Sequence, residues 1–221
     1  DLNKLELLAP AGTIESFKAA CQNGADAVYM GIEKFNARVM AENFNINDYI
    51  DCIEYAHMRN VKVYLTLNTL LYDDEINEAL EIVLKLYSKG LDAVIVQDIG
   101  FAMLIHDLIP DLQLHASTQM SIYSLSQVKY LQRLGFTRVV LARELSVEEI
   151  KYICKNCDIE IEVFVHGALC VCFSGQCLLS STIGNRSANR GSCAQPCRMK
   201  YSLYNSKNKE IVKESYLMSK K

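Results

Sequence analysis

Apolar and polar positions alternate in blocks along this chain. A short apolar run is followed by a turn, and then by a longer segment whose apolar residues are three or four apart. The short runs are typical of buried strands and the longer segments of amphipathic helices. The predicted strands are 5–8, 27–30, 61–67, 93–96, 112–115, 138–141 and 159–165. The predicted helices include 13–23, 47–58, 74–88, 125–134 and 147–154.

The ends of these helices carry recognisable signals. Most close on a Gly or Asn, in the sequences QNG, MRN, SKG and RLG, where a helix C-terminus favours a residue in the left-handed conformation. Ser146 and Asp73 are suited to the N-cap positions of the helices that follow them.

Strands that alternate with helices indicate βαβ units and a parallel sheet. Seven such units, with residues 216–219 as an eighth strand, favour an α/β fold with a closed, TIM-barrel-like (β/α)8 barrel. A doubly wound open sheet is the alternative. The chain stops at YLMSKK and begins without Met, so we expect an excised piece, truncated after the eighth strand.

One segment does not fit the alternating pattern. We expect residues 1–221 to form a single domain, with no internal linker. Residues 166–200, directly after the seventh predicted strand, form a long irregular insertion that contains five of the nine cysteines. Long loops in compact domains are usually functional.

Composition limits the class of protein. Half of the 221 residues are hydrophobic, but no run approaches the 18 apolar residues of a membrane span, and the N-terminus does not resemble a signal peptide. We therefore expect a cytoplasmic protein with no membrane contact. In that compartment disulfides are rare, and clustered cysteines indicate metal or redox chemistry.

Charge is unevenly distributed. Residues 1–183 contain 14 Lys and Arg against 24 Asp and Glu, a net charge of −10. Residues 184–221 contain 9 Lys and Arg against 2 Glu, a net charge of +7. The basic segment is either a solvated tail or a surface that faces a polyanion. Because the whole chain is acidic, any contact with RNA has to be local.

Polar residues follow several of the predicted strands. In a parallel barrel the reactive groups gather at the carboxyl ends of the strands, so these residues are candidates for the site. The titratable groups there are candidate proton carriers: His115, Glu144 and His166. The candidates for substrate binding at the same rim are Asn68, Gln119 and Arg143. For each one alone, a hydrogen-bonded barrel cap is the alternative.

The cysteines fall into three groups, of which the CxxC pair Cys154 and Cys157 is predicted to be structural, with metal binding as the alternative. Cys21 and Cys52 sit at apolar helical positions and are predicted to be structural. Four others have the spacing C-x6-C-x15-C-x3-C in a loop rich in Gly, Ser and Asn: Cys170, Cys177, Cys193 and Cys197. Four thiolates suit a [4Fe–4S] cluster or a structural zinc ion, and the x6 spacing fits zinc knuckles poorly. Cys172 is left over as a poor ligand.

A nucleophilic site is another interpretation of the same loop. His166 precedes Cys170 by four residues, and a thiolate beside an imidazole is the centre of a cysteine protease. Such a site requires the two side chains at hydrogen-bonding distance, and it would leave three spare thiols in the loop. A scaffold with a purely structural metal is the third interpretation.

Several segments resemble a known family. EVFVHGALCVCFSGQCLLS is similar to the signature of the U32 group, catalogued as collagenase-like peptidases, and LELLAPAG, LHASTQ and RSANRGSCAQPCR are similar to other family segments. RSANRG followed by CAQPCR most resembles the branch that hydroxylates a cytidine of 23S ribosomal RNA at C5. Sister branches act on tRNA uridine or on ubiquinone precursors.

The resemblance implies an oxygen-independent hydroxylation that depends on an iron–sulfur cluster and on prephenate. It matches Cys170, Cys177, Cys193 and Cys197 to the cluster ligands, with the fourth ligand the one that varies between branches. It implies ribosomal RNA or its precursor as partner. Zinc in an aerobic preparation, a U32 peptidase and tRNA hydroxylation are the alternatives.

Two arginines flank the cysteine segment. Arg186 and Arg190 are candidates for RNA phosphates or for the carboxylates of prephenate, with a loop carbonyl or a rim acid as the alternative partner. Members of the ribosomal RNA branch are longer, so we expect further downstream domains that are missing here. We expect the open side of the truncated barrel to promote self-association.

Overall fold

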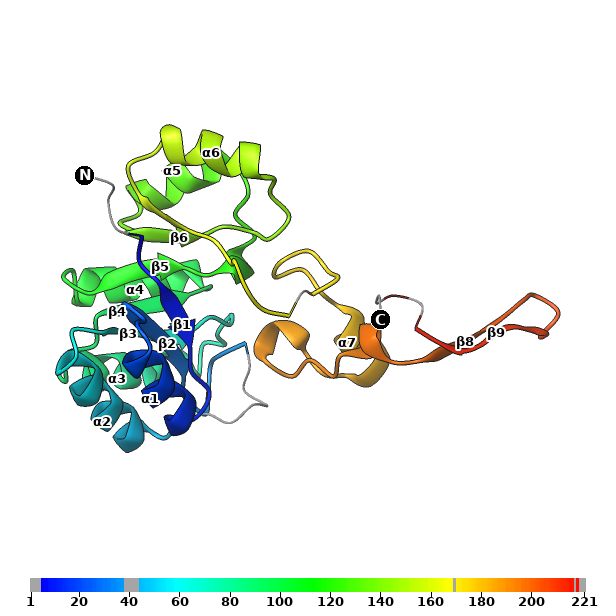
Figure 1. The fold of residues 1–221 in the computed structure, drawn as a ribbon, viewed down its shortest axis with the longest axis horizontal. Helices are drawn as coiled ribbons and strands as arrows, with labels where there is room; N and C mark the ends of the chain where they lie inside the picture. The colour runs from blue at the N-terminus through cyan, green and yellow to red at the C-terminus, as the bar shows by residue number, and fades with distance from the viewer. Residues whose placement is uncertain (1–4, 38–43, 169, 217, 219–221) are drawn as a thin grey trace.

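A curved parallel sheet forms the larger part of the molecule in this computed structural model (Figure 1). The structure describes all residues except 1–4, 38–43, 169, 217 and 219–221. Seven strands lie in the order of the sequence, and each pairs in parallel with the next. They are β1 (Leu8–Pro10), β2 (Ala27–Gly31), β3 (Lys62–Leu67), β4 (Ala93–Val96), β5 (Gln113–Ala116), β6 (Arg138–Val140) and β7 (Glu160–Glu162).

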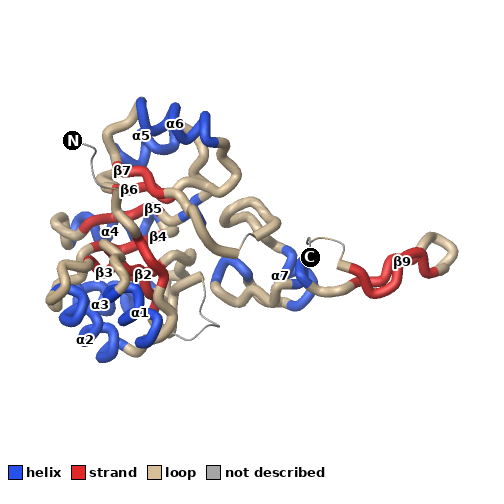
Figure 2. Tube along the Cα trace, viewed as in Figure 1, coloured by secondary structure: helices blue, strands red, loops and turns tan. Residues whose placement is uncertain are grey.

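Six helices connect these strands and cover the outer face of the sheet (Figures 1 and 2). They are α1 (Ile14–Gln22), α2 (Ile46–His57), α3 (Ile76–Tyr87), α4 (Ile99–Leu108), α5 (Leu125–Arg133) and α6 (Val147–Lys155). None of the described helices is both long and apolar enough to cross a membrane.

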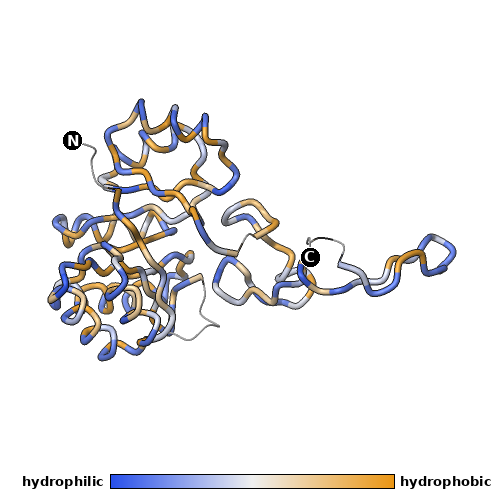
Figure 3. The backbone as a smooth tube through the Cα atoms, viewed as in Figure 1, coloured by the Kyte–Doolittle hydropathy of each residue, from blue (hydrophilic) through white to orange (hydrophobic). Residues whose placement is uncertain are grey.

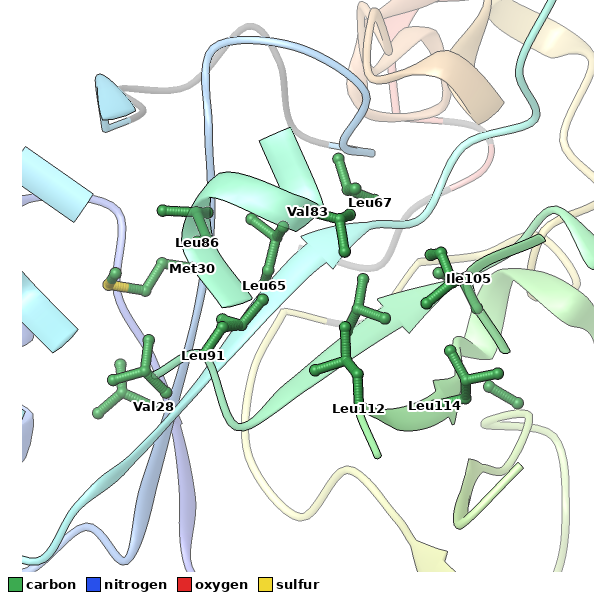
Figure 4. Close-up of a cluster of buried hydrophobic side chains, with 14 of the residues drawn as sticks. Val28, Met30, Leu65, Leu67, Val83, Leu86, Leu91, Ile105, Leu112 and Leu114 are labelled. Atoms are coloured by element: carbon green, nitrogen blue, oxygen red, sulfur yellow. The ribbon is translucent and has the colours of Figure 1, made fainter. Parts of the chain in front are cut away.

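Two apolar layers explain why the strands read as continuous hydrophobic runs. Alternate strand residues such as Val28, Leu65 and Leu114 point outward and pack against the helices (Figure 4). The intervening residues, Tyr64 and Ile95 among them, point to the inner face and form a smaller cluster. Figure 3 shows the same concentration of hydrophobic residues along the sheet.

The helix signals of the sequence are largely confirmed. The Gly or Asn of all four expected turns has a positive φ, between 56° and 95°. Ser146 caps α6 and accepts a hydrogen bond from Glu149 N. The expectation for Asp73 is wrong, because α3 begins at Ile76 behind Glu75, which makes no side-chain cap.

The closed eight-stranded barrel is also wrong for the described residues. Among them no strand joins β1 to β7, and the sheet is an open half-barrel of seven strands. Of the expected eighth strand, residues 217 and 219 lie outside the described residues, while Tyr216 and Met218 are not in a strand. The chain instead forms an antiparallel hairpin, β8 (Tyr201–Tyr204) and β9 (Glu210–Ser215), which projects away from the sheet (Figure 1).

An ionic network spans the inner face near the amino ends of the strands. The Arg138 guanidinium donates to Glu6 (2.6 Å) and to Glu160 (2.6 Å), and lies 3.5 Å from Glu162. Tyr64 also donates to Glu6, at 2.9 Å. Burial raises the pKa of Glu162 to about 7 in spite of the nearby Arg138. Side chains therefore link β6 and β7 to the segment before β1, across an edge that no strand of the described residues bridges.

Candidate functional site

The carboxyl ends of the strands carry a connected set of polar side chains. Asn68, after β3, accepts a hydrogen bond from Ala37 N (2.9 Å) and donates to Ser117 Oγ (3.2 Å). Gln97, after β4, donates to the Gln119 carbonyl oxygen (3.3 Å). The structure thus joins strands β3, β4 and β5 at this rim, and brings Asn68 and Gln119 to the same end of the sheet.

Some acceptors at this rim have no partner. The side-chain oxygens Gln97 Oε1 and Gln119 Oε1 are buried and accept no hydrogen bond from the described residues. Buried polar atoms are normally satisfied, so an unpartnered acceptor at a strand end is a feature that a bound donor group would complete. Gln97 follows β4 directly, which is the strand-end position that the sequence predicts for residues of the site.

The residues after β6 hold the cysteine-rich loop (166–200). Arg143 Nη1 donates to the Cys170 carbonyl oxygen (3.3 Å) and Nη2 to the Cys172 carbonyl oxygen (3.2 Å), while Nε donates to Ser174 Oγ (3.1 Å). The Glu144 carboxylate accepts a hydrogen bond from Ser174 N (2.9 Å). Ser174 itself is fully buried. Arg143 and Glu144 therefore fix the backbone of the segment that carries Cys170 and Cys172.

A close backbone approach anchors the same segment to the turn after β5. Gly175 has φ +72°, and a Cβ atom at this position would lie 2.1 Å from the Gln119 carbonyl oxygen. Ser121, itself in the left-handed conformation, donates to the Ser174 carbonyl oxygen (2.5 Å) and accepts from Gln176 Nε2 (2.9 Å). Only glycine fits this contact without a shift, because the neighbouring atom belongs to the backbone.

A second anchor holds the far part of the loop. The Arg190 guanidinium donates to Glu75 Oε1 (2.5 Å) and to the Leu70 carbonyl oxygen, and lies 4.4 Å from the centre of the Tyr72 ring. The partners of Arg190 are thus a rim acid and a loop carbonyl, as in the structural alternative to substrate binding. A role of Arg190 in substrate binding stays a prediction. The other oxygen of the same carboxylate, Glu75 Oε2, accepts a hydrogen bond from Tyr72 N (2.8 Å).

Arg186 differs from Arg190. Its side chain is exposed, and within the described residues no ion pair or side-chain hydrogen bond involves its guanidinium. It follows α7 (Leu179–Gly184), the short helix of the loop, and precedes a 3-10 turn at Ala188–Arg190. Of the two arginines, Arg186 is the one whose charge is available to a ligand.

The four predicted ligand thiols are electrostatic neighbours. Burial raises the pKa of the Cys197 thiol, and the sulfurs of Cys170, Cys193 and Cys177 raise it further. Cys172, predicted above to be a poor ligand, lies within hydrogen-bonding reach of Cys177. Burial raises the pKa of the Cys172 thiol, and the sulfur of Cys177 raises it further. Cys170 and Cys193 are exposed.

These cysteines fit an iron–sulfur centre by the chemistry of their donors. Thiolates are the ligands that such clusters require, and all of the loop thiols are free in the described residues. Ser180 Oγ, buried on α7, accepts from Ala194 N (2.8 Å) and so ties the Cys193–Cys197 segment to the rest of the loop. As they lie, no three metal-binding side chains of the described chain converge on one ion. The thiols are gathered but do not form a closed cage.

The two histidines among the predicted proton carriers have very different surroundings. His115 lies on the inner face of β5, wholly buried, 4.7 Å from the Tyr64 ring, and neither ring nitrogen has a hydrogen-bond partner among the described residues. Burial lowers its pKa to about 3, so it is neutral near pH 7. The structure does not bring His115 to the loop.

His166 lies at the start of the cysteine-rich loop and is exposed. In the described part of the chain it makes no hydrogen bond to a cysteine, so the pair that a cysteine protease requires is not formed there. Glu144 is bonded to the loop through Ser174, whereas His166 is itself the first residue of the loop.

Comparisons with known proteins support one family. The model of peptidase family U32 matches residues 12–221. The chain is 44% identical, over 99% of its length, to the 23S rRNA 5-hydroxycytidine C2501 synthase of Escherichia coli, and covers 33% of that protein. It is 38% identical, over 94% of its length, to tRNA hydroxylation protein P of the same organism, and covers 46% of it. The chain thus spans a third to about half of these relatives.

Two further similarities concern peptidases. An uncharacterized protease of Methanocaldococcus jannaschii is 43% identical over 98% of this chain, which covers 55% of that protein. The solved structure of the U32 peptidase Mk0906 has a TM-score of 0.62 at 14% identity, and the match covers 72% of this chain and 68% of that one. At this identity the structural similarity supports the fold alone, an α/β half-barrel.

Proposed function

This chain belongs to peptidase family U32, and from that premise we propose that it is the half-barrel part of an iron–sulfur-dependent RNA base hydroxylase. The reaction is the oxygen-independent C5 hydroxylation of a cytidine in 23S ribosomal RNA, with prephenate as co-substrate. One observation carries the proposal: a loop with four neighbouring thiols is fixed at the carboxyl ends of the strands by Arg143 and Glu144. The relative at 44% identity supplies the reaction.

The cluster would be held by Cys170, Cys177, Cys193 and Cys197. When bound, a [4Fe–4S] cluster supplies electron transfer or an iron atom with Lewis acidity. The protein's own contribution is placement. Arg143 fixes the carbonyl groups of the first cysteine segment, and loops positioned on strand ends are where this class of sheet carries its chemistry.

Side chains that have no partner within the described residues can bind anionic groups of the substrates. Arg186 is exposed and unpaired within the described residues, so it suits an RNA phosphate or a prephenate carboxylate. Asn68 and Gln119 lie deeper at the rim, and the unpartnered Gln119 Oε1 accepts a hydrogen bond from a bound hydroxyl or amine. Glu144 and His166 are the acids and bases that lie near the loop.

The RNA contact is local. Residues 184–221 carry the net charge of +7, of which four positive charges precede the hairpin of β8 and β9, while the hairpin adds three lysines against two glutamates and has a hydrophilic tip (Figure 3). Lysines on such an arm bind phosphates without reading sequence.

Nucleoside mass spectrometry of ribosomal RNA tests this function. A strain that lacks the gene should lose 5-hydroxycytidine, and the gene on a plasmid should restore it, whereas the Cys177→Ser gene should not. Unchanged 5-hydroxycytidine in the deletion strain would refute the ribosomal substrate. Loss of a hydroxylated uridine from tRNA instead would favour the second candidate, which the tRNA hydroxylation relatives support.

A U32 peptidase has less support from the geometry. Two relatives are named as a protease and a collagenase, at 43% and 36% identity. The described residues, however, contain no hydrogen-bonded Cys–His pair. Release of peptides from gelatin by the purified protein, blocked by a thiol reagent, would be the result in favour of this activity.

A further inference from the structure

We propose that the cavity between the turn after β5 and the cysteine-rich loop binds a single unpaired cytosine base. This inference rests on the proposed function and names the place where the substrate base sits. The cavity has a volume of about 490 Å³ and lies beside the carboxyl end of β6. It falls within the roughly 300–1,000 Å³ of small-molecule sites, which suits one nucleotide and excludes a duplex.

Two aromatic rings line this cavity. Tyr123 and Phe173 are 58% and 66% exposed, although both belong to large hydrophobic residue types. Tyr123 comes from the turn before α5, and Phe173 from the cysteine-rich loop, so two separate segments each contribute a ring. Exposed rings at a cavity are the usual stacking surfaces for unpaired bases, because every base has a π-face.

A fixed carboxylate supplies the polar edge. Glu144 lines the cavity, and its hydrogen bonds from Ser174 N and Ser174 Oγ occupy only part of the roughly four acceptor sites of a carboxylate. The remaining sites suit an amine donor. Cytosine presents the N4 amino group, whereas uracil presents the O4 carbonyl oxygen in its place, so Glu144 favours cytosine.

The cavity is held in shape before a ligand binds. Ser121 accepts from Gln176 and donates to the Ser174 carbonyl oxygen, and all three residues line the cavity. A preformed site avoids the entropic cost of ordering its walls on binding. The lining also connects the base to the cysteines, because Phe173, Ser174 and Gln176 lie in the sequence between Cys172 and Cys177. A base in this cavity would therefore contact the segment that joins these two cysteines.

Binding of short RNA tests the inference without any turnover. The probe is a labelled single strand of about ten nucleotides, in three versions with cytidine, uridine or an abasic site at the centre, measured by fluorescence anisotropy at constant salt. We expect the full chain to bind the cytidine strand about tenfold more tightly than the abasic strand. Equal affinity for the two strands would overturn the inference.

Three variants locate the effect. In Tyr123→Leu and Phe173→Leu, which keep apolar volume but remove the ring, we expect the cytidine preference to fall to about twofold or less. Tyr152→Leu is the matched control, since Tyr152 is 60% exposed on α6 and does not line the cavity. An equal loss of preference in the control would overturn the assignment of the rings.

Glu144→Gln tests the polar edge. We expect wild-type protein to prefer the cytidine strand over the uridine strand about tenfold, and the variant to lose this preference, because an amide can also donate to O4. Equal binding of cytidine and uridine by wild-type protein would refute the role of Glu144. If the protein binds RNA in a base-dependent way but its deletion leaves 5-hydroxycytidine unchanged, the proposed reaction is refuted. The cavity would then still be a site for the base. Loss of 5-hydroxycytidine in the deletion strain, together with binding that does not depend on the base, would keep the proposed reaction but refute the cavity as the site of the base.

Discussion

The half-barrel and the cysteine-rich loop are stabilised by different interactions. In the half-barrel, buried Leu, Ile, Val and Phe side chains fill the space between strands and helices. The last buried hydrophobic side chain of the described core is Ile159; within the described part of residues 166–200, the buried residues are Ser174, Ser180, Gly191 and Pro196. Large apolar side chains of the loop, such as Phe173 and Leu178, are exposed.

This difference shows where each region obtains its stability. Burial of apolar surface stabilises the half-barrel independently of any ligand. The loop depends on hydrogen bonds that involve Arg143, Glu144 and Arg190, and on the close approach of Gly175. Binding of a metal centre contributes directly to the folding free energy of such a segment.

The largest expected effect separates the two kinds of cysteine. Cys177→Ser should abolish the visible absorbance and the iron content of protein reconstituted under anaerobic conditions, because it removes a thiolate from the cluster site. Cys52→Ser is the control, since Cys52 is buried on α2 and burial raises its pKa to about 12, which keeps it a thiol. Iron content in Cys177→Ser equal to that of wild type would contradict the ligand assignment.

A core substitution should lower the stability of the half-barrel and leave iron loading unchanged. Leu65 is fully buried on β3, so Leu65→Ala should reduce the free energy of unfolding by about 2–5 kcal/mol, as measured by urea denaturation. Below its melting temperature the variant should still load iron to the wild-type level, because no loop contact involves this residue. Failure to load iron while folded would mean that the two regions are coupled.

Gly175→Ala should act on the loop alone. The positive φ costs about 1–3 kcal/mol for a residue with a Cβ, and the contact with the Gln119 carbonyl oxygen adds to it. We expect faster hydrogen exchange in residues 170–177 and lower iron loading, with an unchanged unfolding transition of the half-barrel. Gly24→Ala is the matched control, because Gly24 has φ +93° but open space around its Cβ position. Similar exchange of the loop in both variants would contradict the docking contact.

The smallest effect concerns the pH dependence of the half-barrel. His115 has a pKa of about 3 when folded, against 6.5 for the free side chain, so the unfolded state binds more protons between these values. Stability is therefore lost as the pH falls from 6.5 towards 3, by up to about 1.4 kcal/mol per pH unit from this residue. His115→Phe should remove this contribution, so that urea denaturation at pH 7 and pH 5 differs less than in wild type. An unchanged difference between the two pH values would contradict a buried neutral imidazole.

The sequence predicts the repeated part of the fold well, for a local reason. Strands β2 to β6 are found within one or two residues of their expected positions, because each carries apolar residues that pack against the helices and ends at a turn signal. Closure of the barrel depends on pairing between distant segments, which local patterns do not encode. The alternation around Tyr201–Tyr204 and the polar residues after it are typical of a hairpin, a signal that was missed.

The site is less predictable than the fold. The cysteines were found because their spacing lies within one loop. Arg143 and Glu144 were selected from their position after β6, but their partners lie about thirty residues away, and nothing in the local sequence identifies Ser174 or the Cys170 carbonyl oxygen. His115 could have been placed inward, since Leu114 and Ala116 on either side belong to the outward-facing core.

The described part of the cysteine-rich loop has no hydrophobic core of its own, and this has a consequence for how the protein matures. A half-barrel that completes its packing by Ile159 can fold on the ribosome before the last cysteines have been translated. Carrier proteins that deliver iron and sulfide would then meet a folded platform with accessible thiols, two of which, Cys170 and Cys193, are exposed. Assembly of the proposed cluster would then be a separate, later event, open to control by the supply of iron without loss of the polypeptide itself.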